Sequence, residues 1–318
     1  MEITFRIHRF NPETDKEPHY QEYCFEPPAG FTVLDCLNHI KWHMDDSLAY
    51  RMSCRSSICG SCSMRVNGKA KLVCKTQVSD VVRPGNMVRI DPMGNMPAIK
   101  DLIVDMRPFW ERMEAVNPFL RPADPDPEKE RIQSPEEFRL YVEEATCIMC
   151  GACVSECTSL EADTAFLGPA ALAKAYRFAA DTRDGTRQER LEALQGHGGI
   201  WDCVRCNECV QACPKTVAPM EAIVKLRQMS IDAGLTNTVG ARHVTVFTKL
   251  VGHSGSLDER RLPLEAVGFN PAKLIEMAPL GLKMLAKGKM TPTPHASVEN
   301  VEDIRRIYHE VEGEEKKP

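Results

Sequence analysis

Two cysteine-rich segments of the chain have the same spacing. CIMCGACVSEC runs from Cys147 to Cys157, CVRCNECVQACP runs from Cys203 to Pro214, and both follow the pattern Cys-x2-Cys-x2-Cys-x3-Cys. In such a run the first three thiolates bind one cubane iron-sulfur cluster, and the fourth thiolate binds the cluster of the other run. The sequence therefore predicts that the two segments fold against each other around two clusters.

A third group of cysteines lies nearer the N-terminus and has a different spacing. Cys54, Cys59 and Cys62 form a Cys-x4-Cys-x2-Cys triplet, and Cys74 follows twelve positions later. This is the plant-type ferredoxin spacing for a [2Fe-2S] cluster. The small residues between these cysteines suit a tight loop whose backbone N–H groups turn toward the sulfur atoms. A structural zinc site is the alternative, but the paired Cys-x2-4-Cys knuckles of zinc sites lack this triplet.

The composition limits the class of protein. The chain has 318 residues, enough for two or three domains, and it contains fourteen cysteines. The opening MEITFRIHRF lacks the features of a signal peptide, so we expect reduced thiolates in the cytoplasm rather than disulfides. A net charge of -5 gives no basic surface for nucleic acid. No stretch approaches the roughly 18 consecutive apolar residues of a membrane span, so we expect another chain to provide any anchor.

The residues around the first cysteine group predict a small domain of strands and one helix, covering residues 1–99. Ile3, Phe5 and Ile7 alternate with polar residues, as in a half-buried strand. Thr32 and Asp35 have the spacing of a capping box ahead of a helical apolar pattern. Further strands are expected at residues 22–26, 63–66, 72–74 and 87–90.

The rest of the chain is predicted to be helical. Residues 100–135 read as a helix over Asp101–Glu114 followed by a proline-rich linker. Ser134 is a helix N-cap ahead of Pro135, and this helix should run toward Cys147. Within a helical domain over residues 136–235, further helices are expected from Pro169 and over residues 186–194 and 219–229. Residues 236–318 form a C-terminal extension.

This order of motifs resembles the iron-sulfur subunit of succinate dehydrogenase and fumarate reductase. The resemblance rests on twelve ordered cysteines and on the connecting segments IKDLIVDMRPF and GPAALAKAYRFAADTRDG, and it covers about residues 1–235. It implies an α+β protein in which an N-terminal β-grasp [2Fe-2S] ferredoxin domain precedes an all-α bacterial-type ferredoxin domain with two cubane-type clusters and a helical extension. It also implies electron transfer between a flavoprotein subunit, which carries the FAD, and a membrane partner that reacts with quinone or thiol.

The resemblance also implies the cluster ligands by position. The [2Fe-2S] cluster would be held by Cys54, Cys59, Cys62 and Cys74. The middle [4Fe-4S] cluster would be held by Cys147, Cys150, Cys153 and Cys213. The terminal site would use Cys157, Cys203 and Cys209.

The terminal site departs from the usual pattern of the family. Most members have only three cysteines there and hold [3Fe-4S], whereas this chain has a fourth cysteine, Cys206, between the second and third. A fourth thiolate can retain a fourth iron, so we expect a second [4Fe-4S] cluster, with [3Fe-4S] as the alternative. Cluster type is a main determinant of the reduction potential. A [4Fe-4S] cluster at this site should therefore be a stronger reductant than a [3Fe-4S] cluster.

A second departure concerns the membrane partner. The family has proline after the last cysteine of the first run, whereas Cys157 is followed by Thr158, and Trp201 is the one tryptophan near the terminal cysteines in sequence. In these departures the chain resembles the branch of the family whose membrane partner carries CCG domains, which also occur in heterodisulfide reductases. We therefore expect a peripheral protein on the cytoplasmic side of the cell membrane, held there by its partner subunits.

Several alternatives stay open at this point. The chain could instead be a stand-alone polyferredoxin or belong to a soluble thiol:fumarate reductase. Residues 270–290 combine lysines with leucines and methionines and suit a membrane surface, a partner chain or a helix hairpin broken at Pro279. His39 and His43 lack the context of a metal site, and Cys24 and Cys36 are expected to be small buried hydrophobic residues. We identify no catalytic residue for dicarboxylates on this chain.

Overall fold

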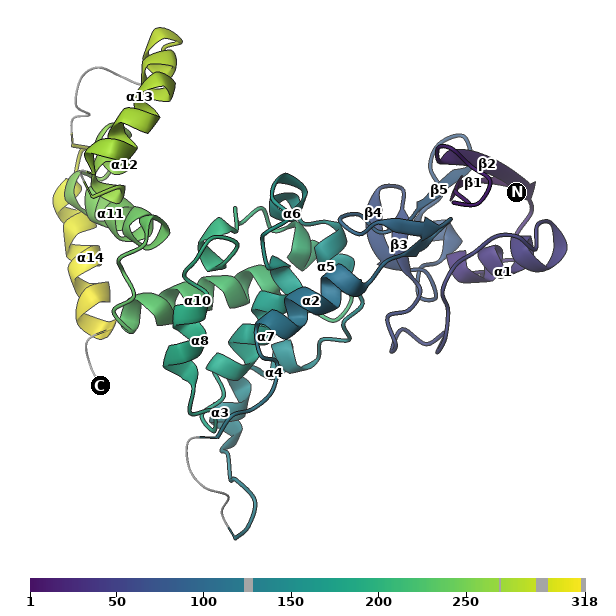
Figure 1. Ribbon diagram of the computed structural model, residues 1–318, viewed down its shortest axis with the longest axis horizontal. Coiled ribbons are helices and arrows are strands. Elements are labelled where there is room, and N and C mark those ends of the chain that lie inside the picture. The colour runs from purple at the N-terminus through teal and green to yellow at the C-terminus, as the bar shows by residue number, and fades with distance from the viewer. Residues whose placement is uncertain (123–127, 269, 290–296, 316–318) are drawn as a thin grey trace. The chain divides into compact units, whose positions relative to one another are not determined.

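The computed structural model of the protein describes residues 1–122, 128–268, 270–289 and 297–315. The chain divides into two compact units, Met1–Met229 and Ser230–Pro318, and each is described by itself. Figure 1 shows that the strands belong to the N-terminal part and that helices make up the remainder. Among the described residues, none of the helices has the length and apolar character needed to cross a membrane.

A five-stranded sheet forms the N-terminal part of the first unit. Its strands are β1 (Ile3–Arg9), β2 (His19–Phe25), β3 (Ser63–Val66), β4 (Lys69–Leu72) and β5 (Met87–Asp91). They lie in the order β2-β1-β5-β3-β4, with β1 and β5 parallel and the other neighbouring pairs antiparallel. The expected strands at the N-terminus and at residues 63–66 and 87–90 are confirmed.

Two strands differ from the sequence-based expectation. Strand β2 begins at His19, because it pairs with β1 along the whole length of that strand. Strand β4 ends at Leu72 and does not reach Cys74. The tight turn at Asn67 and Gly68, both with positive φ, lets strand pairing begin at once on its far side, so Cys74 falls in the turn that follows β4.

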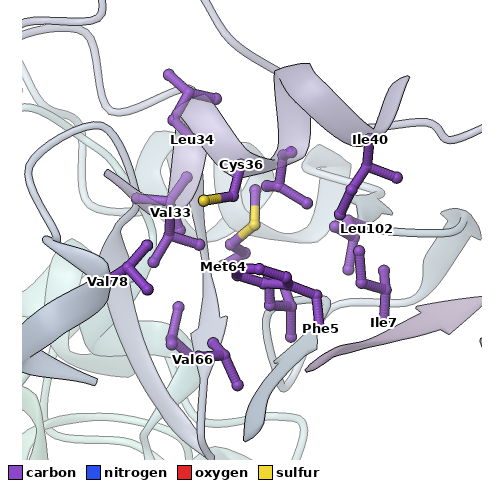
Figure 2. Close-up of a cluster of buried hydrophobic side chains, with 14 of the residues drawn as sticks. Phe5, Ile7, Val33, Leu34, Cys36, Ile40, Met64, Val66, Val78 and Leu102 are labelled. Atoms are coloured by element: carbon purple, nitrogen blue, oxygen red, sulfur yellow. The ribbon is translucent and has the colours of Figure 1, made fainter. Parts of the chain in front are cut away.

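Helix α1 (Val33–His43) packs on this sheet and completes the first hydrophobic core (Figure 2). The Asp35 N–H donates to the Thr32 hydroxyl at 3.2 Å, and the Thr32 N–H donates to the Asp35 carboxylate at 2.9 Å. The predicted capping box is therefore confirmed. The core side chains that Figure 2 labels are Phe5, Ile7, Val33, Leu34, Cys36, Ile40, Met64, Val66, Val78 and Leu102.

A short hairpin of β6 (Ala98–Lys100) and β7 (Ile103–Val104) lies where the sequence predicted a helix beginning at Asp101. The helix was therefore predicted to begin too early in the chain. Asp101 has a left-handed backbone, φ 46°, and its buried carboxylate accepts the Phe10 N–H at 2.9 Å and the Arg9 guanidinium at 3.1 Å. Helix α2 begins only at Arg107 and ends at Ala115.

The helical part of the first unit is built from short helices. They are α3 (Pro135–Arg139), α4 (Val142–Ala145), α5 (Ala152–Ser155), α6 (Thr158–Ala162), α7 (Gly168–Ala179), α8 (Arg187–Ala193), α9 (Glu208–Gln211) and α10 (Pro219–Asp232), whose last three residues belong to the second unit, with a 3-10 turn at Ile200–Asp202. A further 3-10 turn at Val78–Asp80 belongs to the sheet-containing part. The expected helices at α7, α8 and α10 are confirmed. Part of the predicted linker, residues 123–127, lies outside the described residues.

The predicted helix from Ser134 toward Cys147 is interrupted. Ser134 caps α3 as expected, since its hydroxyl accepts the Glu137 N–H at 3.2 Å. The chain then breaks at Tyr141, whose φ of -139° is not helical and whose side chain is buried. Burial of this ring against the helical core therefore overrides the local helical preference, and α4 is a separate turn.

The C-terminal unit contains α11 (Val239–Ser254), α12 (Arg261–Ala266), α13 (Pro271–Ala286) and α14 (Val301–Glu315). Helices α11 and α14 pack closely, because Gly252 lies against the ring of Tyr308. The alternative of a helix hairpin broken at Pro279 is wrong, since α13 continues through this proline. Proline removes one backbone hydrogen bond. No described residue of α13 is buried, so water can hydrogen-bond the freed carbonyl.

Candidate iron-sulfur centres

The loop from Cys54 to Cys62 folds so that its backbone donates to its own sulfur atoms. The N–H groups of Ser56, Ile58 and Cys59 each lie 3.3 Å from Cys54 Sγ. Positive φ angles at Arg55, Ser57 and Gly60 turn the chain tightly enough for this. Such a nest of N–H groups stabilises negative charge on sulfur, which is the condition that a thiolate-bound cluster requires.

Cys74 joins this loop from the end of β4. The Ser57 N–H donates to Cys74 Sγ at 3.3 Å. Burial raises the pKa of the Cys62 thiol to about 12, and the neighbouring Cys74 and Cys59 sulfur atoms add to the shift. The four cysteines predicted to form the first site therefore lie together, although Cys74 is distant from the triplet in sequence.

A second set of four cysteines surrounds an apolar cavity in the helical part. Its members are Cys147, Cys150, Cys153 and Cys213, and the cavity is also lined by Ile148, Met149, Gly151, Ala170, Ala173, Pro214, Lys215, Val217 and Pro219. Burial raises the pKa of the Cys153 thiol well above its ordinary value, and the other three cysteines of the set reinforce the shift. Four half-buried thiols around one apolar space fit a cubane cluster, whose iron and sulfide would fill it.

The third set comprises Cys157, Cys203, Cys206 and Cys209. Burial raises the pKa of the Cys209 thiol to about 12, with contributions from the other three. Cys206 is the exposed member, and its Sγ lies 3.4 Å from the Thr158 hydroxyl. Cys206 also contributes to the raised pKa of the Cys157 and Cys209 thiols, so the position that distinguishes this chain from most of the family it resembles lies near its set.

The two cysteine runs use the same backbone device. In the first run Met149 and Gly151 have φ angles of 53° and 78°, and in the second Arg205 and Asn207 have 57° and 68°. Each pair stands at matching positions, and helices α5 and α9 follow them and pack on each other. The prediction that the two runs fold against each other is confirmed by this packing.

The first cysteine loop lies against the second cysteine set. A Cβ atom at Gly60 would be only 2.7 Å from Cys150 Cβ, so the two loops touch backbone to backbone. Ile148 packs on the hydrophobic core of the sheet domain. Arg65 and Glu156, from the two domains, form an ion pair at 3.2 Å with the carboxylate nearly fully buried. These contacts fix the two domains of the first unit to each other.

Two polar residues near the cysteines were not anticipated from the sequence. Ser63 has a buried hydroxyl without a conventional hydrogen-bond partner, and this hydroxyl lies beside the Cys150 thiol. Arg227 of α10 is buried and donates to the backbone oxygens of Ile200 and Cys203 at 2.7 Å. A serine at a strand start and an arginine on an apolar helix carry no motif, so only their position after folding shows what they contact.

The two histidines and the two further cysteines considered from the sequence have surroundings typical of structural residues. His39 stacks on Phe25 and contacts His43, and no group of three or more metal-ligating side chains suited to a single ion is found among the described residues. Cys36 is buried as expected. Cys24 is exposed, and the contrary expectation is wrong because strand alternation turns Tyr23 inward and Cys24 outward.

The Trp201 indole donates to the Gln195 side chain at 2.9 Å, and its ring faces the Arg227 guanidinium. Both contacts are within the helical part of the first unit.

Two family models match the chain in agreement with this geometry. Residues 4–111 match a 2Fe-2S iron-sulfur cluster binding domain, and residues 143–217 match a 4Fe-4S dicluster domain. The protein is thus a two-domain iron-sulfur protein of mixed α/β structure, with a sheet-containing ferredoxin domain followed by a dicluster domain.

The curated relatives define the family. The fumarate reductase iron-sulfur subunit of Haemophilus influenzae is 40% identical over 233 residues, which cover 70% of this chain and 90% of the relative. The succinate dehydrogenase iron-sulfur subunit of Coxiella burnetii is 40% identical over 228 residues, 71% of this chain and 95% of the relative. The chain belongs to the family of iron-sulfur electron-transfer subunits of fumarate reductase and succinate dehydrogenase.

One relative matches a longer part of the chain. The 8-methylmenaquinol:fumarate reductase iron-sulfur subunit of Wolinella succinogenes is 35% identical over 296 residues, 91% of both chains. This match is too long to end at residue 235, so it extends into the C-terminal unit. The solved Mycobacterium smegmatis Sdh1 complex in the apo form contains a chain with a similar fold, at a TM-score of 0.68 and 24% identity, covering 74% of this chain and 98% of that one.

Proposed function

We propose that the chain is a one-electron relay with three iron-sulfur clusters. Iron-sulfur clusters supply one-electron transfer at potentials set by cluster type and by hydrogen bonds to sulfur. Cys54, Cys59, Cys62 and Cys74 would hold a [2Fe-2S] cluster within a β-grasp domain. Cys147, Cys150, Cys153 and Cys213 would hold a [4Fe-4S] cluster. Cys157, Cys203, Cys206 and Cys209 would hold a second [4Fe-4S] cluster.

The main support for this proposal is that the two cysteine runs of the helical domain exchange their fourth cysteine. Cys213 comes from the second run but lies with Cys147, Cys150 and Cys153 around one apolar cavity. In return Cys157, from the first run, neighbours the cysteines of the second run. This exchange of the fourth ligand is the arrangement expected of paired cubane clusters, and two independent zinc knuckles would not require it.

The chain itself orients and shields these sites. Backbone N–H groups of the first loop point at sulfur, while an apolar cavity lining surrounds the second set. The contact of Gly60 with Cys150 brings the first and second sites to adjacent loops. Neighbouring sites within one compact unit are what a relay between two partner subunits requires.

We further propose the partners from the family. A flavoprotein subunit with FAD would exchange electrons at the [2Fe-2S] side, and a membrane-associated quinone-reactive subunit, of the type with CCG domains, would do so at the terminal site. The relative named an 8-methylmenaquinol:fumarate reductase subunit supports quinol chemistry, and its match extends over the C-terminal unit. The protein would then be peripheral, on the cytoplasmic side of the membrane.

Iron content and EPR spectra of the purified protein test the cluster assignment. One [2Fe-2S] and two [4Fe-4S] clusters predict about ten irons per chain and no three-iron signal in the oxidised protein. The Cys206→Ala variant should lose about one iron and gain a [3Fe-4S] signal. The matched Cys24→Ala variant, at an exposed cysteine outside the sets, should change neither. A three-iron signal in the intact wild type would contradict the assignment at Cys206.

Co-purification tests the partners. A stable complex with a flavoprotein and a membrane protein is expected after mild detergent extraction. An isolated monomer that reduces no quinone would instead indicate a stand-alone polyferredoxin, while a soluble complex active with thiols would indicate a thiol:fumarate reductase.

A further inference from the structure

Helix α13 of the C-terminal unit has no buried residue, although most of its side chains are apolar. Ile275 is 74% exposed, Leu282 is 67% exposed and Leu280 is 61% exposed. Apolar side chains scattered singly over a surface are ordinary, but a whole helix of them is not. This helix therefore lacks within its own unit the burial that normally stabilises an amphipathic helix.

The charges of this helix are confined to one side. Lys273, Glu276, Lys283 and Lys287 follow a helical stripe with steps of three, seven and four residues, and Lys289 comes just after the helix. Ile275 and Leu282, seven residues apart, share the opposite side. Four lysines against one glutamate make residues 271–289 strongly cationic, although the chain as a whole carries a net charge of -5.

The apolar surface continues onto helix α12. A groove between the two helices is lined by Pro263 and Leu264 of α12 and, on α13, by Leu274, Met277, Ala278, Leu280, Gly281, Met284 and Leu285. Arg260 stands at the groove and pairs with Asp258 at 3.1 Å. The exposed apolar surface is thus wider than one face of one helix.

We propose that α13 binds the surface of an anionic phospholipid bilayer, lying in the plane of the interface. Its 16 residues span about 24 Å, too short for the roughly 30 Å hydrocarbon core, so the helix is suited to lie on the membrane rather than cross it. The apolar side would enter the acyl boundary while the lysines meet lipid phosphates. The local positive charge on an acidic chain favours this occupant over another copy of the chain.

Vesicle co-sedimentation of the holoprotein tests the proposal. We expect binding to vesicles containing phosphatidylglycerol, at least about tenfold weaker binding to pure phosphatidylcholine, and release by about 0.5 M salt. The Ile275→Glu/Leu282→Glu variant should bind at least about tenfold more weakly, because two apolar anchors are replaced by carboxylates. The Lys283→Gln/Lys287→Gln variant should lose the preference for anionic lipid. Unchanged iron content and circular dichroism verify that each variant is folded.

The control is the Ile307→Glu/Val311→Glu variant on α14, where two exposed apolar residues receive the same change in charge. It should bind vesicles as the wild type does. The proposal is overturned if the α13 and α14 variants bind equally, or if the wild type binds neither kind of vesicle. In the second case, a concentration-dependent dimer lost only in the α13 variant would identify a second copy of the chain as the occupant. Loss of a membrane-protein subunit from the purified complex would identify that subunit.

Discussion

Gly60 and Cys150 come from different domains, and their backbones touch. A Cβ atom at Gly60 would lie 2.7 Å from Cys150 Cβ and 2.9 Å from Cys150 Cα, and Gly60 has a φ of 75°. Two separate constraints therefore require glycine here: the left-handed backbone and the close approach of the second cysteine loop. The first candidate cluster site is thereby held against the second.

The Gly60→Ala substitution should destabilise the protein by about 2–4 kcal/mol, because backbone strain and a steric clash act together. Gly68→Ala is the matched control, since Gly68 has a φ of 82° but no atom within 4 Å of its would-be Cβ. It should cost only about 1 kcal/mol. Thermal unfolding of the two variants gives the comparison, and equal losses would mean that the contact with Cys150 does not constrain the fold.

Ser63 should tune the site that contains Cys150. Burial raises the pKa of the Cys150 thiol, and the Ala152 N–H and the Ser63 hydroxyl oppose that rise by favouring negative charge on sulfur. Removing the hydroxyl in Ser63→Ala should lower the midpoint potential of the middle cluster by roughly tens of millivolts, because a neighbouring O–H dipole no longer stabilises negative charge on sulfur. EPR-monitored redox titration measures the shift. Ser63→Thr keeps the hydroxyl and should restore most of it.

Removal of iron should unfold the helical part of the first unit and leave the C-terminal unit intact. Helices α5, α6 and α9 have only four or five residues, too few to be stable without the packing that a cluster provides. After chelation we expect rapid hydrogen exchange in these three helices, while the 16-residue α11 keeps its protection. Retained protection around α5 and α9 in the iron-free protein would show that a protein core, and not the clusters, holds these helices.

The two cysteines outside the sets should differ in reactivity. Cys24 is exposed, whereas Cys36 is fully buried in the first core, and burial with a smaller effect of Asp35 raises the pKa of its thiol to about 12. The thiolate is the reactive form. Iodoacetamide at pH 8 should therefore alkylate Cys24 in the folded holoprotein and spare Cys36 until the protein is denatured. Peptide mass spectrometry locates the adducts, and similar alkylation rates at the two sites would contradict the buried position of Cys36.

Asp181 should stabilise the helical domain down to acid pH. Burial alone would raise the pKa of this carboxyl, but hydrogen bonds from Arg183 and the charges of Arg183 and Arg177 lower it to about 2 from 3.8. A lowered folded-state pKa stabilises the fold above pH 3.8, by about 2 kcal/mol, and this stabilisation is lost as the pH falls from 3.8 toward 2.

The Asp181→Asn variant should therefore unfold at lower urea concentration than the wild type by the same margin at pH 7 and pH 5, and by a smaller margin at pH 3. Glu189→Gln is the control, because Glu189 pairs with Arg121 at the surface, where such pairs contribute less than about 1 kcal/mol. A margin that already narrows between pH 7 and pH 5 would show that Asp181 titrates in its ordinary range.

Local patterns predicted the elements whose cause is local. The capping box at Thr32, the N-cap at Ser134 and the helix after Pro169 depend on neighbours within one helical turn, and the structure confirms them. The errors arose where distant contacts decide. Asp101 begins no helix because its carboxylate binds Phe10 and Arg9, and the helix after Ser134 breaks because the Tyr141 ring is buried.

The sequence by itself determined the family and the grouping of cysteines into candidate cluster sets, because thiolate ligands follow one another at short, regular intervals that the cluster dictates. Only the tertiary structure decided that Gly60 touches Cys150, that the Ser63 hydroxyl lies beside the same thiol, and that α13 keeps its apolar side exposed. These relationships depend on burial and on contacts between residues far apart in the chain. A glycine, a serine or a leucine carries no ligand chemistry that would reveal them in sequence.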